Sequence, residues 1–149
     1  MHSMESNFSN RELIVDTINK LFIYTDQQNW DILIDEVFAP EIHVDITSMG
    51  APKAETLTAR ELCNSWEKGF EGLDAVHHQA GNYLITIEDS EAKVFANAIA
   101  SHYKASAKNG TSREFIGSYH LNVTKTRDGW RINRFVYQLK YMTGNKNLS

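Results

Sequence analysis

The stretch REFIGSYHLNVTKTRDGWRINRFVYQLKYM, residues 113–142, decides the fold class. β-Branched and aromatic residues are frequent on both sides of its short polar turn at residues 127–129, and the glycine of that turn is typical of a tight hairpin. The stretch therefore predicts two long antiparallel strands, at residues 113–126 and 130–142.

Two segments upstream have the same character. Residues 77–88 and 92–107 are rich in β-branched and aromatic residues, and the connections between neighbouring segments have hairpin length. We therefore expect an antiparallel meander of four strands in the second half of the chain.

The first half of the chain is predicted to be mainly helical. Residues 9–12, SNRE, have the spacing of a capping box, and an apolar stripe at helical spacing follows them to about Thr25. A second stripe begins at Trp30 and ends before Pro40, and the polar residues 26–29 separate the two. The pattern predicts two helices that meet at this polar break.

A strand and a third helix are predicted next. Residues 41–47 alternate strictly between apolar and polar, which predicts a strand. A second capping box, at residues 58–61, is followed by apolar residues at four-residue steps, which predicts a helix over residues 59–69. The expected fold is therefore α+β, with helices first and a long curved sheet after them.

Length and composition limit the class of protein. With 149 residues, 42% apolar and 23% charged, the chain has the balance of one folded domain, residues 1–149, with a core at about 9–142 and mobile polar ends. The net charge of -4 provides no positive field to collect phosphates, so nucleic acid is not an expected partner.

The cysteine content and the amino terminus give further expectations. Cys63 is the one cysteine, which excludes an internal disulfide, and we interpret it as a buried helix residue. The three tryptophans are likewise interpreted as packing residues. The first fifteen residues lack an apolar signal, and no stretch approaches the ~20 apolar residues of a membrane span. We therefore expect a cytoplasmic protein with no membrane partner.

The order of these elements, together with three short motifs, resembles the NTF2-like superfamily in its SnoaL-like branch. The motifs are YTDQQNWD at 24–31, FAPEI at 38–42 and DGWRI at 128–132, and the likeness spans nearly the whole chain. The resemblance implies an α+β cone, in which N-terminal helices pack against a strongly curved, mainly antiparallel sheet and enclose a pocket for a small hydrophobic molecule. It also implies a homodimer that pairs through the outer face of the sheet.

Within that branch, four residues resemble the site of scytalone dehydratase, a cofactor-free enzyme that eliminates water from a ring. Asp26 matches its histidine-orienting aspartate, and His78 its catalytic histidine. His102 matches the second histidine of that site, and Ser118 the pocket serine.

Three positions of that site differ. Thr25 and Ile46 stand where the dehydratase has two tyrosines, and His120 stands where it has an asparagine. An aspartate and histidine without the tyrosines also resemble the pair in hexachlorocyclohexane dehydrochlorinase and in bile-acid dehydratases. The resemblance thus implies an eliminating or isomerising site that needs no cofactor, with Thr25, Ile46 and His120 among the substrate-binding residues.

These residue types suit that chemistry. A neutral imidazole is the side chain best able to take up a proton at neutral pH, so His78 is the candidate base. A hydrogen bond to Asp26 would fix its tautomer and stabilise the imidazolium. His102, Ser118 and His120 are the candidate donors to a substrate oxygen, and Ser118 and His120 share one face of their strand unless a bulge intervenes.

Two other interpretations stay open. The chain could be a non-catalytic ligand-binding or association module, which the missing tyrosines favour, with Asp26 as a simple helix cap. Alternatively, His78, His102, His120 and Asp26 could together bind iron, zinc or copper, although their spacing matches no metal motif and no resident metal is expected.

Overall fold

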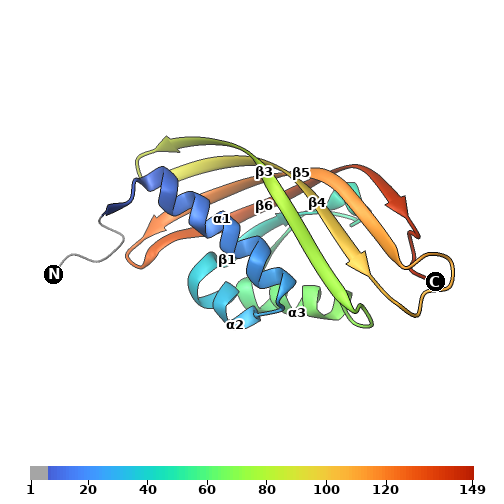
Figure 1. The fold of residues 1–149 in the computed structure, drawn as a ribbon. Coiled ribbons are helices and arrows are strands. Elements are labelled where there is room, and N and C mark those ends of the chain that lie inside the picture. The colour runs from blue at the N-terminus through green and yellow to red at the C-terminus, as the bar shows by residue number, and fades with distance from the viewer. Residues whose placement is uncertain (1–6) are drawn as a thin grey trace.

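A long curved sheet arches over the helices of the first half of the chain in the computed structural model, which describes residues 7–149 (Figure 1). The sheet has six strands in the order β2-β1-β6-β5-β4-β3. In chain order the strands are β1 (Phe38–Asp45), β2 (Glu55–Thr58), β3 (Ala75–Glu88), β4 (Glu91–Tyr103), β5 (Ser112–Thr126) and β6 (Gly129–Gly144). The α+β class and the curved, mainly antiparallel sheet are those predicted.

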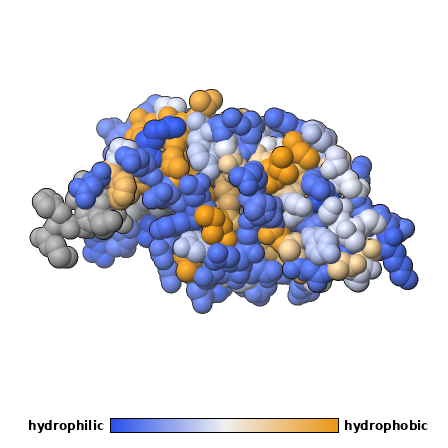
Figure 2. All heavy atoms as spheres, viewed as in Figure 1, coloured by the Kyte–Doolittle hydropathy of each residue, from blue (hydrophilic) through white to orange (hydrophobic). Residues whose placement is uncertain are grey.

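Helix α1 (Asn10–Asp26) begins at the predicted capping box. The Glu12 N–H donates to the Ser9 hydroxyl oxygen at 3.1 Å, and the Ser9 N–H donates to the Glu12 carboxylate at 3.0 Å. One face of the helix is buried against the sheet, and the molecular surface on the α1 side is mostly hydrophilic, with hydrophobic side chains in small separate groups (Figure 2). The amphipathic pattern thus fixes which face of α1 meets the core.

Helix α3 (Ala59–Gly69) has the predicted bounds, and its capping box is complete. Thr58 and Glu61 exchange hydrogen bonds of 2.9 and 3.1 Å between side chain and backbone. Cys63 lies on the buried side of this helix, where burial raises the pKa of its thiol to about 11. Such a thiol stays protonated at neutral pH, which agrees with the interpretation of Cys63 as a packing residue.

The second predicted helix is shorter than expected. It consists of α2 (Trp30–Ile32) and a π-helical turn, η2 (Leu33–Val37), after which β1 begins at Phe38 instead of residue 41. Phe38 is buried and pairs with Ile132 of β6. Sheet pairing and burial therefore outweigh the helical spacing that the sequence shows there.

The four long strands form the predicted antiparallel meander, and three features of the sheet differ from the prediction. Strand β4 ends at Tyr103, not at residue 107, because the Asp74 carboxylate accepts a 2.7 Å hydrogen bond from the Ala105 N–H and turns the chain. Strand β2 was not predicted. Strand β1 pairs with β2 in antiparallel and with β6 in parallel orientation, and it gives way at Thr47 to the 3-10 turn η3 (Thr47–Met49).

The carboxyl-terminal residues, predicted to be mobile, pack onto the fold. Leu148 is buried, and the N–H groups of Lys108 and Asn109 both donate to the Ser149 carbonyl, at 3.1 and 3.0 Å. Residues 1–6 of the other predicted mobile end lie outside the described residues. Within residues 7–149, no helix has both the length and the apolar character to cross a bilayer.

Candidate active site

A cavity of about 210 Å³ lies between the concave face of the sheet and helices α1 and α3. Aromatic side chains form most of its walls, among them Phe22, Trp66, Phe70, Phe115 and Phe135. None of the described residues that line it is Lys, Arg, Asp or Glu. Because a cavity of ~150 Å³ suffices for benzene, this one has room for a substituted ring without a formal charge.

Asp26 and His78 meet beside this cavity. The Asp26 Oδ1 lies 2.6 Å from His78 Nδ1, and the Asp26 Oδ2 accepts the His78 backbone N–H at 2.9 Å. Because a carboxylate accepts hydrogen bonds, His78 Nδ1 carries a proton in this contact, and in the neutral form of the ring the lone pair is then on Nε2. The two bonds fix both the orientation and the tautomer of the imidazole ring, whose side chain is 10% exposed.

The position of Asp26 in the fold argues against a simple capping role. Asp26 is the last residue of α1, where a negative charge interacts unfavourably with the helix dipole. The side chain that caps the next helix is that of Asn29, whose Oδ1 accepts the Ile32 N–H at 3.5 Å. The Asp26 carboxylate is therefore directed toward His78 and not toward the start of α2.

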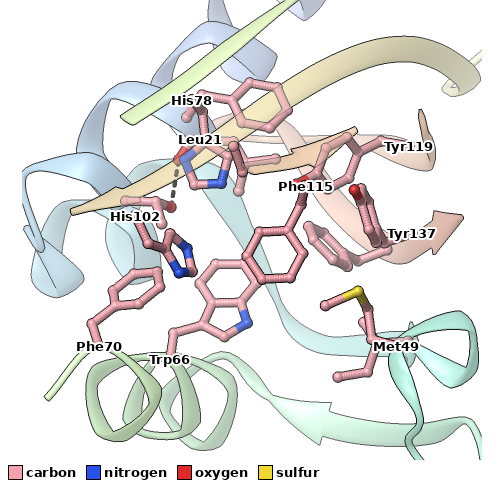
Figure 3. Close-up of a pocket in the computed structure, with 14 residues that line it drawn as sticks. Leu21, Met49, Trp66, Phe70, His78, His102, Phe115, Tyr119 and Tyr137 are labelled. Atoms are coloured by element: carbon pink, nitrogen blue, oxygen red, sulfur yellow. Dashed lines mark hydrogen bonds between the residues drawn. The ribbon is translucent and has the colours of Figure 1, made fainter. Parts of the chain in front are cut away.

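His102 lies diagonally across from His78 on the neighbouring strand. In the β3–β4 register His78 is opposite Ala100, and His102 is opposite Val76. Figure 3 shows both imidazole rings directed into the cavity, with Tyr119 and Tyr137 across from them.

Arg113 fixes the orientation of the His102 ring through a hydrogen bond to Nδ1. Arg113 Nε donates to His102 Nδ1 at 3.1 Å, and Phe70 and Phe115 pack on the ring at centroid distances of 5.6 and 5.0 Å. Burial first, and then the charges of Arg113 and His78, lower the pKa of His102 to about 4. His102 is therefore a neutral imidazole at physiological pH.

Thr25 and Ile46 line the cavity, as the resemblance implies. The Thr25 hydroxyl donates to the Leu21 carbonyl within α1, so it is engaged in the helix, and the Ile46 side chain is apolar. Neither residue supplies a free polar group to a ligand.

Ser118 and His120, expected in the pocket, lie on the outer face of the sheet instead. Strand β5 directs Phe115, Tyr119 and Leu121 toward the concave side of the sheet. Because side chains alternate along a strand, Ser118 and His120 face outward. His120 is exposed and packs against Phe95, with ring centroids 5.2 Å apart. The two residues share a face, as predicted, but that face is not the one that the resemblance implies.

The outward position of His120 also argues against the alternative in which His78, His102, His120 and Asp26 bind a metal together. His120 lies on the other side of the sheet from His78 and His102, and His78 Nδ1 is occupied by Asp26. Across residues 7–149, no three His, Cys, Asp or Glu side chains gather as metal ligands would.

The cavity also contains two tyrosines that are not among the expected site residues. Tyr119 of β5 and Tyr137 of β6 are paired in register, with ring centroids 4.8 Å apart. Burial raises the pKa of Tyr137 to about 12, and burial with the nearby Tyr137 and Asp26 raises that of Tyr119 further. Both hydroxyls therefore stay protonated at neutral pH. The alternation of buried residues along β5, and at Phe135 and Tyr137 of β6 beyond an irregularity in its register, could have shown that these tyrosines face the core.

Gly117 and Trp66 also contribute to the shape of the cavity. A Cβ at Gly117 would lie 2.5 Å from the Tyr137 hydroxyl oxygen, so the Tyr137 ring can lie over the strand only because residue 117 has no side chain. Trp66, interpreted from the sequence as a packing residue, also lines the cavity from α3.

Comparison with known proteins agrees with this fold. A family model described as SnoaL-like domain matches residues 7–136. The Kfla4162 protein from Kribbella flavida has a similar structure, with 21% identity, a TM-score of 0.88 and coverage of 93% of this chain and 95% of that chain.

Two further solved structures are similar. A candidate scytalone dehydratase from Novosphingobium aromaticivorans has 18% identity, a TM-score of 0.78 and coverage of 96% of this chain and 92% of that chain. Hexachlorocyclohexane dehydrochlorinase LinA-type3 from Novosphingobium barchaimii has 13% identity, a TM-score of 0.72 and coverage of 91% and 89%. No curated protein matches the sequence. At these identities the structural likeness shows the fold.

Proposed function

This chain belongs to the SnoaL-like domain family, with the NTF2-like fold, and we propose that it is a lyase or isomerase that acts on a small, cyclic, hydrophobic molecule. The proposal needs no cofactor, because a positioned base and hydrogen-bond donors suffice for the removal of a proton next to a leaving group.

The observation that carries the proposal is the pair of hydrogen bonds between Asp26 and His78 at the wall of an apolar cavity. In the proposed step, His78 Nε2 takes a proton from a ring carbon, and the electrons of that C–H bond form a carbon–carbon double bond. The leaving group departs from the adjacent carbon with its own electron pair. Asp26 stabilises the imidazolium, which then returns the proton to the departing hydroxide or, in an isomerisation, to another carbon.

The known relatives support this class of reaction. Among similar structures, a candidate scytalone dehydratase would eliminate water and a dehydrochlorinase eliminates hydrogen chloride. Both reactions combine the loss of a proton with the loss of a leaving group. The cavity favours the same kind of substrate, because its lining residues are largely aromatic and carry no fixed charge.

The proposal can be tested with 3-hydroxy-1-tetralone, a cyclic β-hydroxy ketone whose loss of water gives fluorescent 1-naphthol. His78→Gln should lower the rate by ~10²–10⁴-fold, the usual contribution of a general base. Asp26→Asn should lower it by at least about tenfold, since the amide cannot stabilise the imidazolium. His120→Gln is the matched control, because His120 lies on the outer face, and its rate should equal that of the wild type.

Equal rates for the wild type and His78→Gln would contradict the proposal. The same experiment examines the alternative, a non-catalytic binding module, which the absence of the two tyrosines favours. Such a module would bind the ketone without turnover, and His78→Gln would leave its dissociation constant unchanged.

A further inference from the structure

The two histidines of the cavity have charged partners of opposite kind. His78 Nδ1 meets the Asp26 carboxylate, which only accepts hydrogen bonds, and His102 Nδ1 meets the Arg113 guanidinium, which only donates them. Nδ1 of His78 must therefore carry a proton, and Nδ1 of His102 must not. It follows that His102 carries its N–H on Nε2, whereas a neutral His78 ring, the form that a general base needs, has its lone pair there.

From this difference we propose that Arg113 is a positioning residue that holds His102 as a neutral Nε2–H donor to a carbonyl oxygen of the substrate. The proposal rests on the proposed function, because His78 is taken to remove the proton from the carbon next to that carbonyl. The C–H electrons then form the carbon–carbon double bond of an enolate, and the carbonyl π electrons move to the oxygen that His102 binds. The substrate class is thereby narrowed to cyclic ketones with an acidic α-hydrogen.

The surroundings of His102 suit such a donor. His102 is 9% exposed and its ring lies among Phe70 and Phe115, where a hydrogen bond to a developing oxyanion is stronger than in water. A neutral imidazole can polarise a carbonyl without competing with His78 for the proton. The charged or titratable groups that act on it are Arg113 from β5, His78 from β3 and Asp26 from α1.

Arg113 is itself held in place. It lies opposite His102 in the β4–β5 register, and its guanidinium carbon is 5.5 Å from the centroid of the Phe115 ring. Its Nη1 donates to the Lys146 carbonyl at 3.0 Å. The guanidinium thus binds the Lys146 carbonyl through Nη1 and His102 through Nε.

The other polar groups of the cavity support a ligand with an acceptor oxygen. Tyr119 lines it and carries a hydroxyl group that can donate a hydrogen bond, whereas the Tyr137 hydroxyl group is fully buried. A carbonyl oxygen accepts such bonds, whereas the chlorine atoms of a chloroalkane are weak acceptors. The donors therefore favour ketone elimination or isomerisation over dehydrochlorination.

Nitrogen NMR of the imidazole groups in the ligand-free protein tests the tautomer directly. In the wild type, His102 should show a protonated Nε2 and an unprotonated Nδ1, and should not titrate between pH 8 and about 5. Arg113→Met should give a mixture of tautomers and a titration at higher pH, and Arg113→Lys should restore part of the wild-type pattern. A protonated Nδ1 in the wild type, or no change in Arg113→Met, would overturn the role of Arg113.

Ligand binding tests the carbonyl assignment without any need for turnover. Calorimetry would compare 1-tetralone with tetralin, the same ring system without the carbonyl. His102→Phe should weaken 1-tetralone binding about tenfold, equal to ~1.4 kcal/mol, and should leave tetralin binding within about twofold. If the wild type fails to prefer 1-tetralone, or if the variant weakens both ligands equally, the assignment is wrong. An inactive enzyme that keeps the ketone preference would contradict the proposed function alone.

Discussion

Tyr137 has a buried hydroxyl group that makes no hydrogen bond to any of residues 7–149. Burial of an unpaired polar group costs about 1–3 kcal/mol, and this cost is unusual in a packed core. The Tyr137 side chain lines the cavity, but its hydroxyl oxygen packs against β5 at Gly117, where an added Cβ would lie 2.5 Å from it.

Tyr137→Phe should therefore raise the free energy of unfolding, by ~1 kcal/mol, because it removes the unpaired oxygen and keeps the ring. Urea unfolding at neutral pH measures the change. Tyr83→Phe is the control of opposite sign, since the Tyr83 hydroxyl donates to Asn19 at 2.8 Å and its loss should destabilise the protein or have no effect. A loss of stability in Tyr137→Phe would mean that its hydroxyl is satisfied in solution.

His102 should make stability depend on pH in a defined window. In the unfolded chain it takes up a proton near its ordinary pKa of 6.5, but in the folded protein only near 4. Between these values the unfolded state binds more protons, so the free energy of unfolding falls as the pH is lowered. Above pH 6.5 the residue is neutral in both states and contributes no pH dependence.

The full effect of this shift is about 3 kcal/mol of destabilisation between pH 7 and 4. Surface carboxylates titrate in the same range, so the measurement is the difference between the wild type and His102→Gln in denaturant unfolding at several pH values. The wild type should lose stability relative to the variant as the pH falls. Parallel curves would show that His102 is protonated in the folded protein as easily as in the unfolded chain.

At the residue scale, the sequence was most informative where two kinds of argument agreed. The resemblance pointed to Asp26 and His78, and the structure brings their side chains within 2.6 Å. It also pointed to Ser118 and His120 as pocket residues. The alternation of buried residues along β5 instead directs Ser118 and His120 outward. Strand periodicity reflects burial in this chain, whereas a matched position in a distant relative does not, so periodicity was the better guide.

At the scale of elements, local signals were sufficient for α1 and α3. Their capping boxes satisfy the first N–H groups of each helix with nearby side chains, so the starts depend on residues only three positions apart. Strand β2 and the parallel pairing of β1 with β6 depend on contacts between distant parts of the chain. No short-range pattern contains those contacts, which explains why the sequence did not predict them.

The carboxyl-terminal tail illustrates how a distant contact can reach the candidate site. Its Lys146 carbonyl accepts a hydrogen bond from Arg113, and Asn145 Nδ2 donates to the Gly110 carbonyl at 3.0 Å. A segment that the sequence predicted to be a mobile polar end thus supports Arg113, which binds His102.

Removal of residues 145–149 should therefore loosen Arg113 and change His102 in the same direction as Arg113→Met, but less. The measurement is the imidazole titration of His102 by NMR, with unfolding curves to verify that the shortened chain is folded. Lys146→Ala is the control that keeps the backbone carbonyl and should resemble the wild type. A folded, shortened protein with an unchanged His102 would show that Arg113 needs no support from the tail.

At the scale of the whole molecule, the outer face of the sheet carries an apolar row across three strands. Ile99 of β4 is opposite Ile116 of β5, which is opposite Tyr141 of β6. Ile99 and Tyr141 are 48% and 56% exposed. The rows around them hold polar side chains, including Asn97 and His120, so the face combines an apolar centre with groups that can form hydrogen bonds.

We propose that two copies of the chain pair through this face, with Ile99 near the centre of the contact. A stable interface of standard size covers ~800 Å² on each partner, so a charge at its centre should be costly. Sedimentation velocity at micromolar concentration should give a dimer for the wild type and a monomer for Ile99→Lys. Ile23→Lys is the matched control, because Ile23 is equally exposed, at 52%, but lies on α1, and it should remain dimeric. A monomeric wild type, or a dimer that tolerates Ile99→Lys, would contradict the proposal and leave the row of apolar side chains facing solvent.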